Sequence, residues 1–172
     1  MLYLKEANFE DIEKEYAFVR EIPLDENGFG NEWHGCSREV FEREALPKML
    51  RFAKGEDLPE GFVPETYLFL WDDDTIVGQF RLRHYLCESL RTGGGHIGYF
   101  IHRQYRGRGY GSAGLGLTLE IARNIVPEEE FYLRLDRGNM ASLRVMQKNG
   151  GRIVDEDDAK IYVRIPNPGK TE

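Results

Sequence analysis

The sequence predicts a single domain of the α/β class, in which a mixed sheet carries helices on its faces. The chain has 172 residues, of which 41% are hydrophobic and 31% are charged, as in an ordinary globular domain. Stretches that alternate apolar and polar residues are interspersed with stretches that repeat apolar residues at helical spacing. We therefore expect one domain over residues 1–166 and a short tail over residues 167–172.

The net charge, the cysteine content and the lack of long apolar runs exclude some classes of partner and cellular setting. The formal net charge of −7 argues against a general nucleic-acid binder and is compatible with a cationic substrate such as an amine. Cys36 and Cys87 lie far apart without metal-like spacing, which favours a reduced, cytoplasmic setting and structural roles for both thiols. No apolar run approaches the roughly 18 residues of a membrane helix, and no apolar signal segment starts the chain, so we expect no membrane partner.

The first half of the chain predicts helices followed by a hairpin. Asn8 is a suitable N-cap for a helix whose apolar stripe begins at Phe9. Ser37 caps a second helix, which Pro47 kinks or divides. The expected elements are a strand near residues 2–4, a helix over 8–21, an irregular loop over 23–36, a helix over 37–54 and a hairpin of strands over 65–71 and 75–86.

Two polar segments flank the second hairpin strand. Residues 72–74 are three aspartates, and with no further ligand at useful spacing they predict a solvated turn and no metal site. Residues 87–95 end in three glycines, which cannot form a good strand interior. We expect this second segment to be a flexible connection.

The second half predicts alternating strands and helices. Apolar residues at spacings of four, three and four place a helix after residue 109, and Pro127 stops it. Asn139 is the expected N-cap of a second helix that ends at Gly150-Gly151. The expected elements are a strand over 96–102, a helix with Leu115, Leu119, Ala122 and Val126 inward, a strand over 131–136, a helix over 139–148 with Leu143 and Met146 inward, and a hairpin over 152–165.

A loop rich in arginine and glycine joins the strand at 96–102 to the helix that follows. Glycines let backbone N–H groups turn toward a ligand, and the first N–H groups of a helix carry the positive end of its dipole. Residues 106–112, RGRGYGS, therefore predict a cradle for a phosphate or pyrophosphate. The loop lacks the Gly-Lys-Ser/Thr of a P-loop, and Ser112 stands where a dinucleotide fingerprint has its third glycine.

Two motifs resemble the GNAT-type N-acetyltransferase superfamily. Arg106, Gly109 and Gly111 fit the Gln/Arg-x-x-Gly-x-Gly/Ala pattern of its acetyl-CoA loop. About 30 residues further on, Asn139 and Ser142 are similar to its second signature, Asn-x-x-Ala/Ser. The order of elements resembles that fold across nearly the whole chain. The resemblance implies a mostly antiparallel sheet of about seven strands with helices on both faces, and a splay between the strands at 96–102 and 131–136.

The resemblance also implies a binding site for acetyl-CoA as cosubstrate, without a metal. The pantetheine arm would enter the splay and pair with the first strand, and loop amides would bind the pyrophosphate. The implied cofactor-binding residues are Phe100, Ile101, His102, Arg106, Gly107, Arg108, Gly109, Tyr110, Gly111, Ser112, Asn139 and Ser142.

The catalytic groups are less well defined by the resemblance. Many relatives place a Tyr where this chain has Met146, which cannot protonate a thiolate. Asn139 would lie beside the thioester. Some relatives place a Glu, as the general base, near the start of the strand that leads into the loop, where this chain has Gly95-His96. His96, with an ordinary pKa of about 6.5, suits a general base. Weaker candidates for the base are Glu88, His84 and Tyr99, and Tyr132 or Tyr162 could line the acceptor site.

These observations predict an acetyl-CoA-dependent N-acetyltransferase that transfers the acetyl group directly to a primary amine of a small molecule or peptide. The alternative is a non-catalytic acyl-CoA sensor on the same fold, which Met146 favours. A third, weaker hypothesis is a mononucleotide-binding protein that uses the loop for another phosphate. A homodimer is compatible with all three hypotheses.

Overall fold

Two antiparallel sheets form the frame of the computed structural model, which describes residues 1–170. The larger is a four-stranded sheet in the order β1 (Leu2–Glu6), β4 (Glu65–Asp72), β5 (Thr75–Arg83) and β6 (Ile97–Ile101). The smaller is a three-stranded sheet in the order β7 (Glu130–Asp136), β9 (Lys160–Pro166) and β8 (Arg152–Glu156). Every strand pairing in these two sheets is antiparallel, which confirms the expected sheet type.

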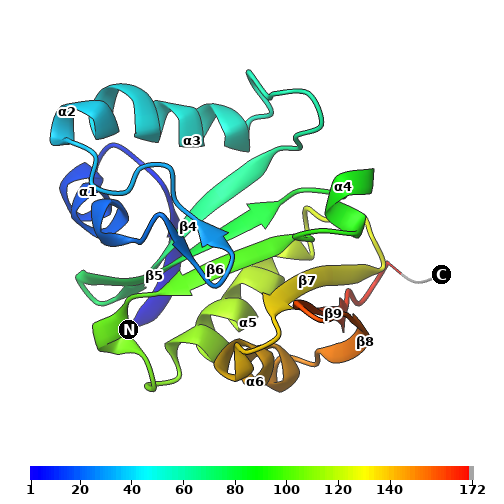
Figure 1. Cartoon of the computed structure of the whole chain (residues 1–172). Helices are drawn as coiled ribbons and strands as arrows, with labels where there is room; N and C mark the ends of the chain where they lie inside the picture. The colour runs from blue at the N-terminus through cyan, green and yellow to red at the C-terminus, as the bar shows by residue number, and fades with distance from the viewer. Residues whose placement is uncertain (171–172) are drawn as a thin grey trace.

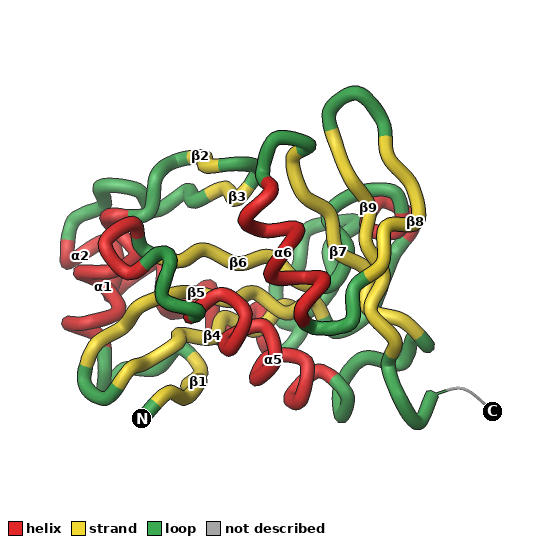
Figure 2. The backbone as a smooth tube through the Cα atoms, turned by 90° about the horizontal axis from the view of Figure 1, so that it is seen from below, coloured by secondary structure: helices red, strands yellow, loops and turns green. Residues whose placement is uncertain are grey.

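Helices cover both faces of the larger sheet (Figure 1). On one face lie α1 (Ile12–Glu21), α2 (Arg38–Val40) and α3 (Leu46–Ala53), and on the other lie α5 (Tyr110–Ala122) and α6 (Met140–Lys148). The short helix α4 (Glu88–Arg91) connects β5 to β6. Figure 2 shows a small hairpin, β2 (Asp25–Glu26) and β3 (Phe29–Gly30), beside β6. No helix within residues 1–170 is long and apolar enough to cross a bilayer.

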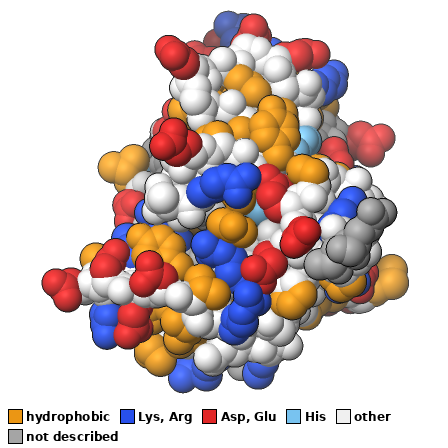
Figure 3. All heavy atoms as spheres, turned by 90° about the vertical axis from the view of Figure 1, so that its right-hand side faces the viewer, with side chains coloured by type: hydrophobic (Ala, Val, Ile, Leu, Met, Phe, Trp, Pro, Cys, Tyr) orange, Lys and Arg blue, Asp and Glu red, His pale blue; other side chains and the backbone are white. Residues whose placement is uncertain are grey.

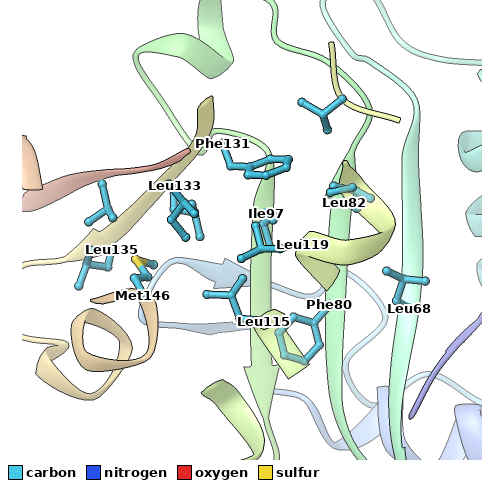
Figure 4. Close-up of a cluster of buried hydrophobic side chains, with 14 of the residues drawn as sticks. Leu68, Phe80, Leu82, Ile97, Leu115, Leu119, Phe131, Leu133, Leu135 and Met146 are labelled. Atoms are coloured by element: carbon cyan, nitrogen blue, oxygen red, sulfur yellow. The ribbon is translucent and has the colours of Figure 1, made fainter. Parts of the chain in front are cut away.

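Alternating side chains of the central strands feed two separate apolar cores. On β4, Leu68 and Leu70 join α5, α6 and β7, whereas Phe69 and Trp71 join α1 and α3. Figure 4 shows the first core, where side chains of both sheets, α5 and α6 point toward one another. The expected inward residues of both C-terminal helices are buried: Leu115, Leu119, Ala122, Val126, Leu143 and Met146.

The position of α5 depends on a close approach to β5. A Cβ atom at Gly114 would lie 2.4 Å from the Phe80 ring and 2.9 Å from Leu70, so any larger residue would push the helix away from the sheet. Because the Arg/Gly loop leads directly into α5, this contact also fixes where the loop lies.

The first helices differ in detail from their predictions. The helix α1 begins at Ile12, and Asn8 caps the preceding turn by accepting a hydrogen bond from the Asp11 N–H at 3.0 Å. Phe9 therefore lies outside the stripe and is 51% exposed. Ser37 accepts a hydrogen bond from the Val40 N–H, as expected of a cap. A π-helical turn over Phe41–Ala45 precedes α3, whose first turn contains the proline that was expected to kink the helix.

The segment over residues 87–95 was predicted to be a flexible connection, and the structure corrects this. It contains α4 and two tight backbone contacts. A Cβ atom at Gly93 would lie 2.4 Å from the Ser89 carbonyl, and one at Gly95 would lie 2.1 Å from the Tyr132 carbonyl. The glycines therefore serve close packing of the backbone.

One buried carboxyl makes the stability of this fold depend on pH. Glu15 of α1 is fully buried, and only one of its oxygens has partners, both of them on Asn8. Burial raises the pKa of Glu15 to about 8, from 4.5 when exposed. Between these values the folded state holds a proton that the unfolded state has lost, so stability falls as the pH rises from 4.5 to 8.

We therefore expect Glu15→Gln to stabilise the protein at alkaline pH. The free energy of unfolding at pH 8 should rise by about 1–3 kcal/mol, with little change at pH 4.5. Denaturant unfolding at both pH values measures this difference. Glu120→Gln, on the exposed side of α5, is the matched control and should change stability equally at both pH values. Equal effects of the two variants would contradict the assignment.

Candidate active site

The main cavity of the described chain lies where the two sheets separate, and its volume is about 510 Å³. Within residues 1–170, main-chain bonding to β7 from this side comes from the two residues just before β6, through the Gly95–Leu133 bridge and a hydrogen bond from the His96 N–H to the Tyr132 carbonyl, 2.7 Å long. Beyond this contact the cavity opens between the strands. It is bordered by β6, β7, the start of α5, the inner side of α6 and the β2–β3 hairpin.

The edge of β6 that faces this opening carries main-chain N–H groups without a partner among residues 1–170. The His102 N–H donates to the Val77 carbonyl of β5, and main-chain groups of alternate residues point to opposite edges of a strand. The N–H groups of Tyr99 and Ile101 therefore face the opening. This corrects part of the expectation, because the main-chain groups of Phe100 and His102 point toward β5 instead.

The Arg/Gly loop presents a run of unpaired N–H groups. Among the residues that the structure describes, none of the N–H groups of residues 107–112 donates a hydrogen bond, and the helical ladder resumes with Ala113 N–H to Gly109 O at 3.1 Å. Gly107 and Gly109 have φ of +76° and +83°, a left-handed conformation that favours glycine. No atom lies within 4 Å of a Cβ built at either position, so the space beside the loop is open.

Two of the loop arginines are held by the hairpin. Arg106 binds Glu26 of β2 at 2.8 Å, and its Nε donates to the Ile101 carbonyl at 2.9 Å. Arg103 reaches the same carboxylate at 3.4 Å. The hydrogen bond from the Arg106 side chain lowers the pKa of Glu26. Arg106 thus connects the loop, the hairpin and the end of β6.

The start of α6 brings the second motif to the cavity. The Asn139 side chain caps the helix by accepting a hydrogen bond from the Ser142 N–H at 3.2 Å. The Ser142 hydroxyl lies 2.5 Å from the Tyr99 hydroxyl, and both residues line the cavity. Burial raises the pKa of Tyr99 to about 12. Met146 lines the same wall and is almost fully buried.

His96 lies outside the cavity. Its side chain is 0% exposed, its Nδ1 accepts a hydrogen bond from the Tyr132 N–H at 2.8 Å, and its Nε2 lies 3.1 Å from a Glu128 carboxylate oxygen. Burial lowers the pKa of this imidazole. A neutral ring with both nitrogens bonded cannot reach a substrate, so the expectation that His96 acts as a base is corrected: its position is structural.

Most of the other expected residues surround the cavity. The expected cofactor residues that line it are Phe100, Ile101, Arg106, Gly107, Gly109, Tyr110, Gly111, Ser112, Asn139 and Ser142. Arg108 does not line it, and His102 lies in a separate shallow depression, where its ring contacts Glu21. Of the weaker catalytic candidates and the two acceptor tyrosines, only Tyr99 borders the cavity.

Further charged side chains that the sequence patterns did not indicate line the cavity. Arg81 and Arg83 of β5 and Arg134 of β7 line the cavity, as do Arg144 and Lys148 of α6. Figure 3 shows Lys and Arg side chains gathered near the middle of one face of the molecule. The alternation of residues along β5 places Arg81 and Arg83 on one face of that strand. It does not reveal that Arg134 of β7 borders the same cavity. Within residues 1–170, no group of three or more His, Cys, Asp or Glu side chains is arranged to hold a metal ion.

The chain belongs to the GNAT acetyltransferase family. A family model described as an acetyltransferase (GNAT) domain matches residues 26–152, which is well over half of the chain. No curated protein matches the sequence. The family match confirms the resemblance on which the site was predicted.

Solved structures share the fold at low sequence identity. Ribosomal-protein-S5-alanine acetyltransferase from Vibrio fischeri is 15% identical with a TM-score of 0.71, covering 99% of this chain and 96% of its own. RimJ from Mycobacterium smegmatis, in complex with CoA-disulfide, is 18% identical with a TM-score of 0.70, covering 96% and 81%. A GNAT-family acetyltransferase from Streptococcus pneumoniae is 19% identical with a TM-score of 0.62, covering 95% and 97%.

We expect His96→Ala to destabilise the fold. Removing the ring leaves the Tyr132 N–H and the Glu128 carboxylate without a partner, which should lower the free energy of unfolding by about 1–3 kcal/mol. Denaturant unfolding measures the loss, and His102→Ala, whose ring is partly exposed, is the control and should cost less. A stable variant that loses about 10²–10⁴-fold in turnover would restore His96 as the base.

Proposed function

We propose that the protein is an acetyl-CoA-dependent N-acetyltransferase that acts on a primary amine. The observation that carries this proposal is the run of unpaired N–H groups over residues 107–112, which lies beside open space at the start of α5. Such a run is suited to the two phosphates of coenzyme A. Membership of the GNAT family supports the same cosubstrate.

The cavity supports a specific path for the cosubstrate. The pyrophosphate would bind the loop amides, and the cations of Arg144 and Lys148 would balance its charge from α6. The pantetheine arm would extend the sheet along the free edge of β6, using the N–H groups of Tyr99 and Ile101. This path leads the sulfur toward Ser142 and the separation between the sheets.

The reaction needs no covalent enzyme intermediate. The neutral amine attacks the thioester carbonyl, and the resulting oxyanion accepts a hydrogen bond from an N–H of β6, which is worth about 3 kcal/mol. Collapse of the tetrahedral intermediate breaks the carbon–sulfur bond, and the thiolate takes a proton. We assign that proton to the Ser142 hydroxyl, which Tyr99 orients through their hydrogen bond. The nitrogen of the intermediate gives its extra proton to water, and a proton from solvent returns through Tyr99 to Ser142, so the amide and the free thiol leave and both hydroxyls end protonated.

The cavity holds no free base within residues 1–170. Its two carboxylates, Glu26 and Asp136, are bound to Arg106 and Lys160, respectively. A paired carboxylate is a weak base, so the site favours amines that lose their proton readily. An α-amino group with a pKa near 8 is neutral far more often at pH 7 than a lysine amine with a pKa near 10.4.

The second candidate function, a non-catalytic acyl-CoA sensor, is favoured by Met146. This side chain stands where many relatives carry the acid, and it is buried. The sensor hypothesis expects cofactor binding without transfer. Thiol release from acetyl-CoA across a broad panel of amines separates the two functions, because release well above background with any amine excludes the sensor.

Titration calorimetry with acetyl-CoA and with coenzyme A tests the cofactor half of the proposal. We expect Gly109→Glu to weaken binding by at least about 100-fold, because it places bulk and negative charge in the cradle. Gly61→Glu is the matched control, since Gly61 has a similar φ of +80° with open space around it and lies outside the cavity. Unchanged affinity in Gly109→Glu, or no binding to the unmodified protein at millimolar cofactor, would defeat the proposal.

We expect Ser142→Ala to lower turnover by about 10²-fold with little change in the KM for acetyl-CoA, because the thiolate loses its proton donor. Tyr99→Phe should lower turnover less, and the double variant should be no slower than Ser142→Ala alone, since the hydroxyls act as one unit. Steady-state rates of thiol release measure all three variants. Additive losses would show that the hydroxyls act independently.

A further inference from the structure

A cationic corner, formed by Arg81, Arg83 and Arg134, lines the cavity near the point where the two sheets meet. We propose that this corner holds a carboxylate carried by the amine acceptor, so that the protein acetylates anionic amines such as amino acids or acidic peptides. The inference rests on the proposed function and names the substrate class of the same site.

Two of these guanidinium groups approach the same stretch of main chain although they come from different sheets. A Cβ atom built on Gly94 would lie 3.2 Å from Nη1 of Arg83, and one built on Gly93 would lie 3.9 Å from Nη1 of Arg134. Because the two glycines are adjacent, β5 and β7 bring their arginines to the same short piece of main chain. Paired guanidinium groups suit a carboxylate, whose two oxygens accept parallel hydrogen bonds.

The protein balances the charge of the corner only in part. Arg83 binds Glu65 at 3.1 Å, and the cavity carboxylates Glu26 and Asp136 are occupied elsewhere. Within residues 1–170, Arg81 and Arg134 make no ion pair. An anion in the corner would therefore meet two guanidinium groups, those of Arg81 and Arg134, that form no ion pair with a carboxylate of the described chain.

Arg81 is held in place by an aromatic ring and two hydrogen bonds. Its guanidinium lies 4.1 Å from the centre of the Phe29 ring, and it donates to the Gly30 carbonyl at 2.7 Å and to Gln79 at 3.1 Å. Burial lowers the pKa of Arg81. Arg81 is half-buried and forms no ion pair within residues 1–170, although Glu65 and Glu32 lie near enough to favour its charged form. A substrate carboxylate would stabilise that charge further.

The corner lies apart from the phosphate cradle. Arg81 is paired in register with Gly98, and the Arg83 N–H donates to the His96 carbonyl at 2.7 Å. Ile101, beside the loop, is at least three residues further along β6, a distance of about 10 Å. The acceptor, rather than the phosphates of coenzyme A, is therefore placed to reach the corner. The same charges repel a polyamine, whose cations would find no free carboxylate in the cavity.

The experiment compares amines that differ only in the anionic group. Amino acids and dipeptides are assayed beside their C-terminal amides with acetyl-CoA, and spermidine serves as the polycationic probe. We expect kcat/KM to favour the free carboxylates by about 10- to 100-fold, and spermidine to be the poorest acceptor. A preference for amides or for spermidine would overturn the proposal.

Variants assign the preference to the corner. We expect Arg134→Gln to raise the KM for carboxylate acceptors about tenfold or more, to leave the amides unchanged and so to remove the preference. Arg134→Lys should restore part of it, and Arg123→Gln, on the exposed end of α5, is the control and should leave it intact. A preference that survives in Arg134→Gln would overturn the proposal.

Two further measurements separate the possible failures. Binding of coenzyme A is measured by calorimetry on the unmodified protein and on each variant. If the unmodified protein does not bind coenzyme A, the proposed function itself fails. If it binds and the variants bind equally well, a change in acceptor preference is due to the corner. Succinyl-CoA is then compared with acetyl-CoA on a neutral amine. If the Arg134-dependent preference follows the acyl group and not the acceptor, the corner serves the donor and the acceptor proposal fails, while acyl transfer stands.

Discussion

The close contact between Gly95 and the Tyr132–Leu133 segment determines where the cavity lies. It joins the two sheets at one point, and the cavity exists because the strands separate beyond that point. The contact requires glycine, since a Cβ at Gly95 would lie 2.1 Å from the Tyr132 carbonyl. The buried His96 ring reinforces it by accepting the Tyr132 N–H, so a residue that resembled a catalytic base instead holds the site together.

The charged lining of the cavity is mostly positive, whereas the chain as a whole is negative. The net charge of −7 agrees with a cationic substrate, yet the charged lining is mostly arginine and lysine. Overall charge is an average over the whole surface, whereas recognition depends on the few groups that face the ligand. The β2–β3 hairpin positions two of these arginines. Glu26 of β2 binds Arg106, and the Gly30 carbonyl of β3 accepts a hydrogen bond from Arg81.

Local patterns predicted the elements better than the site. The stripe of α5 and the Asn139 cap follow from residues close in sequence, and both are confirmed. Gly93–Gly95 were misread because their role depends on contacts with Ser89 and Tyr132, which no local pattern reveals. The unpaired amides of the loop followed from glycine and helix-end chemistry. The approach of Arg83 and Arg134 to the same stretch of main chain did not, since it requires knowing that β5 and β7 flank one cavity.

The guanidinium of Arg81, which forms no ion pair within residues 1–170, also bears on how the protein should be handled. Any small anion at high concentration, such as sulfate or phosphate, is drawn to a cation without such a pair in a sheltered corner. Such ions raise thermal stability by mass action and compete with whatever belongs there. The choice of purification salt therefore matters. We expect sulfate to occupy the corner more than chloride does, so thermal stability and acceptor binding should differ between the two salts.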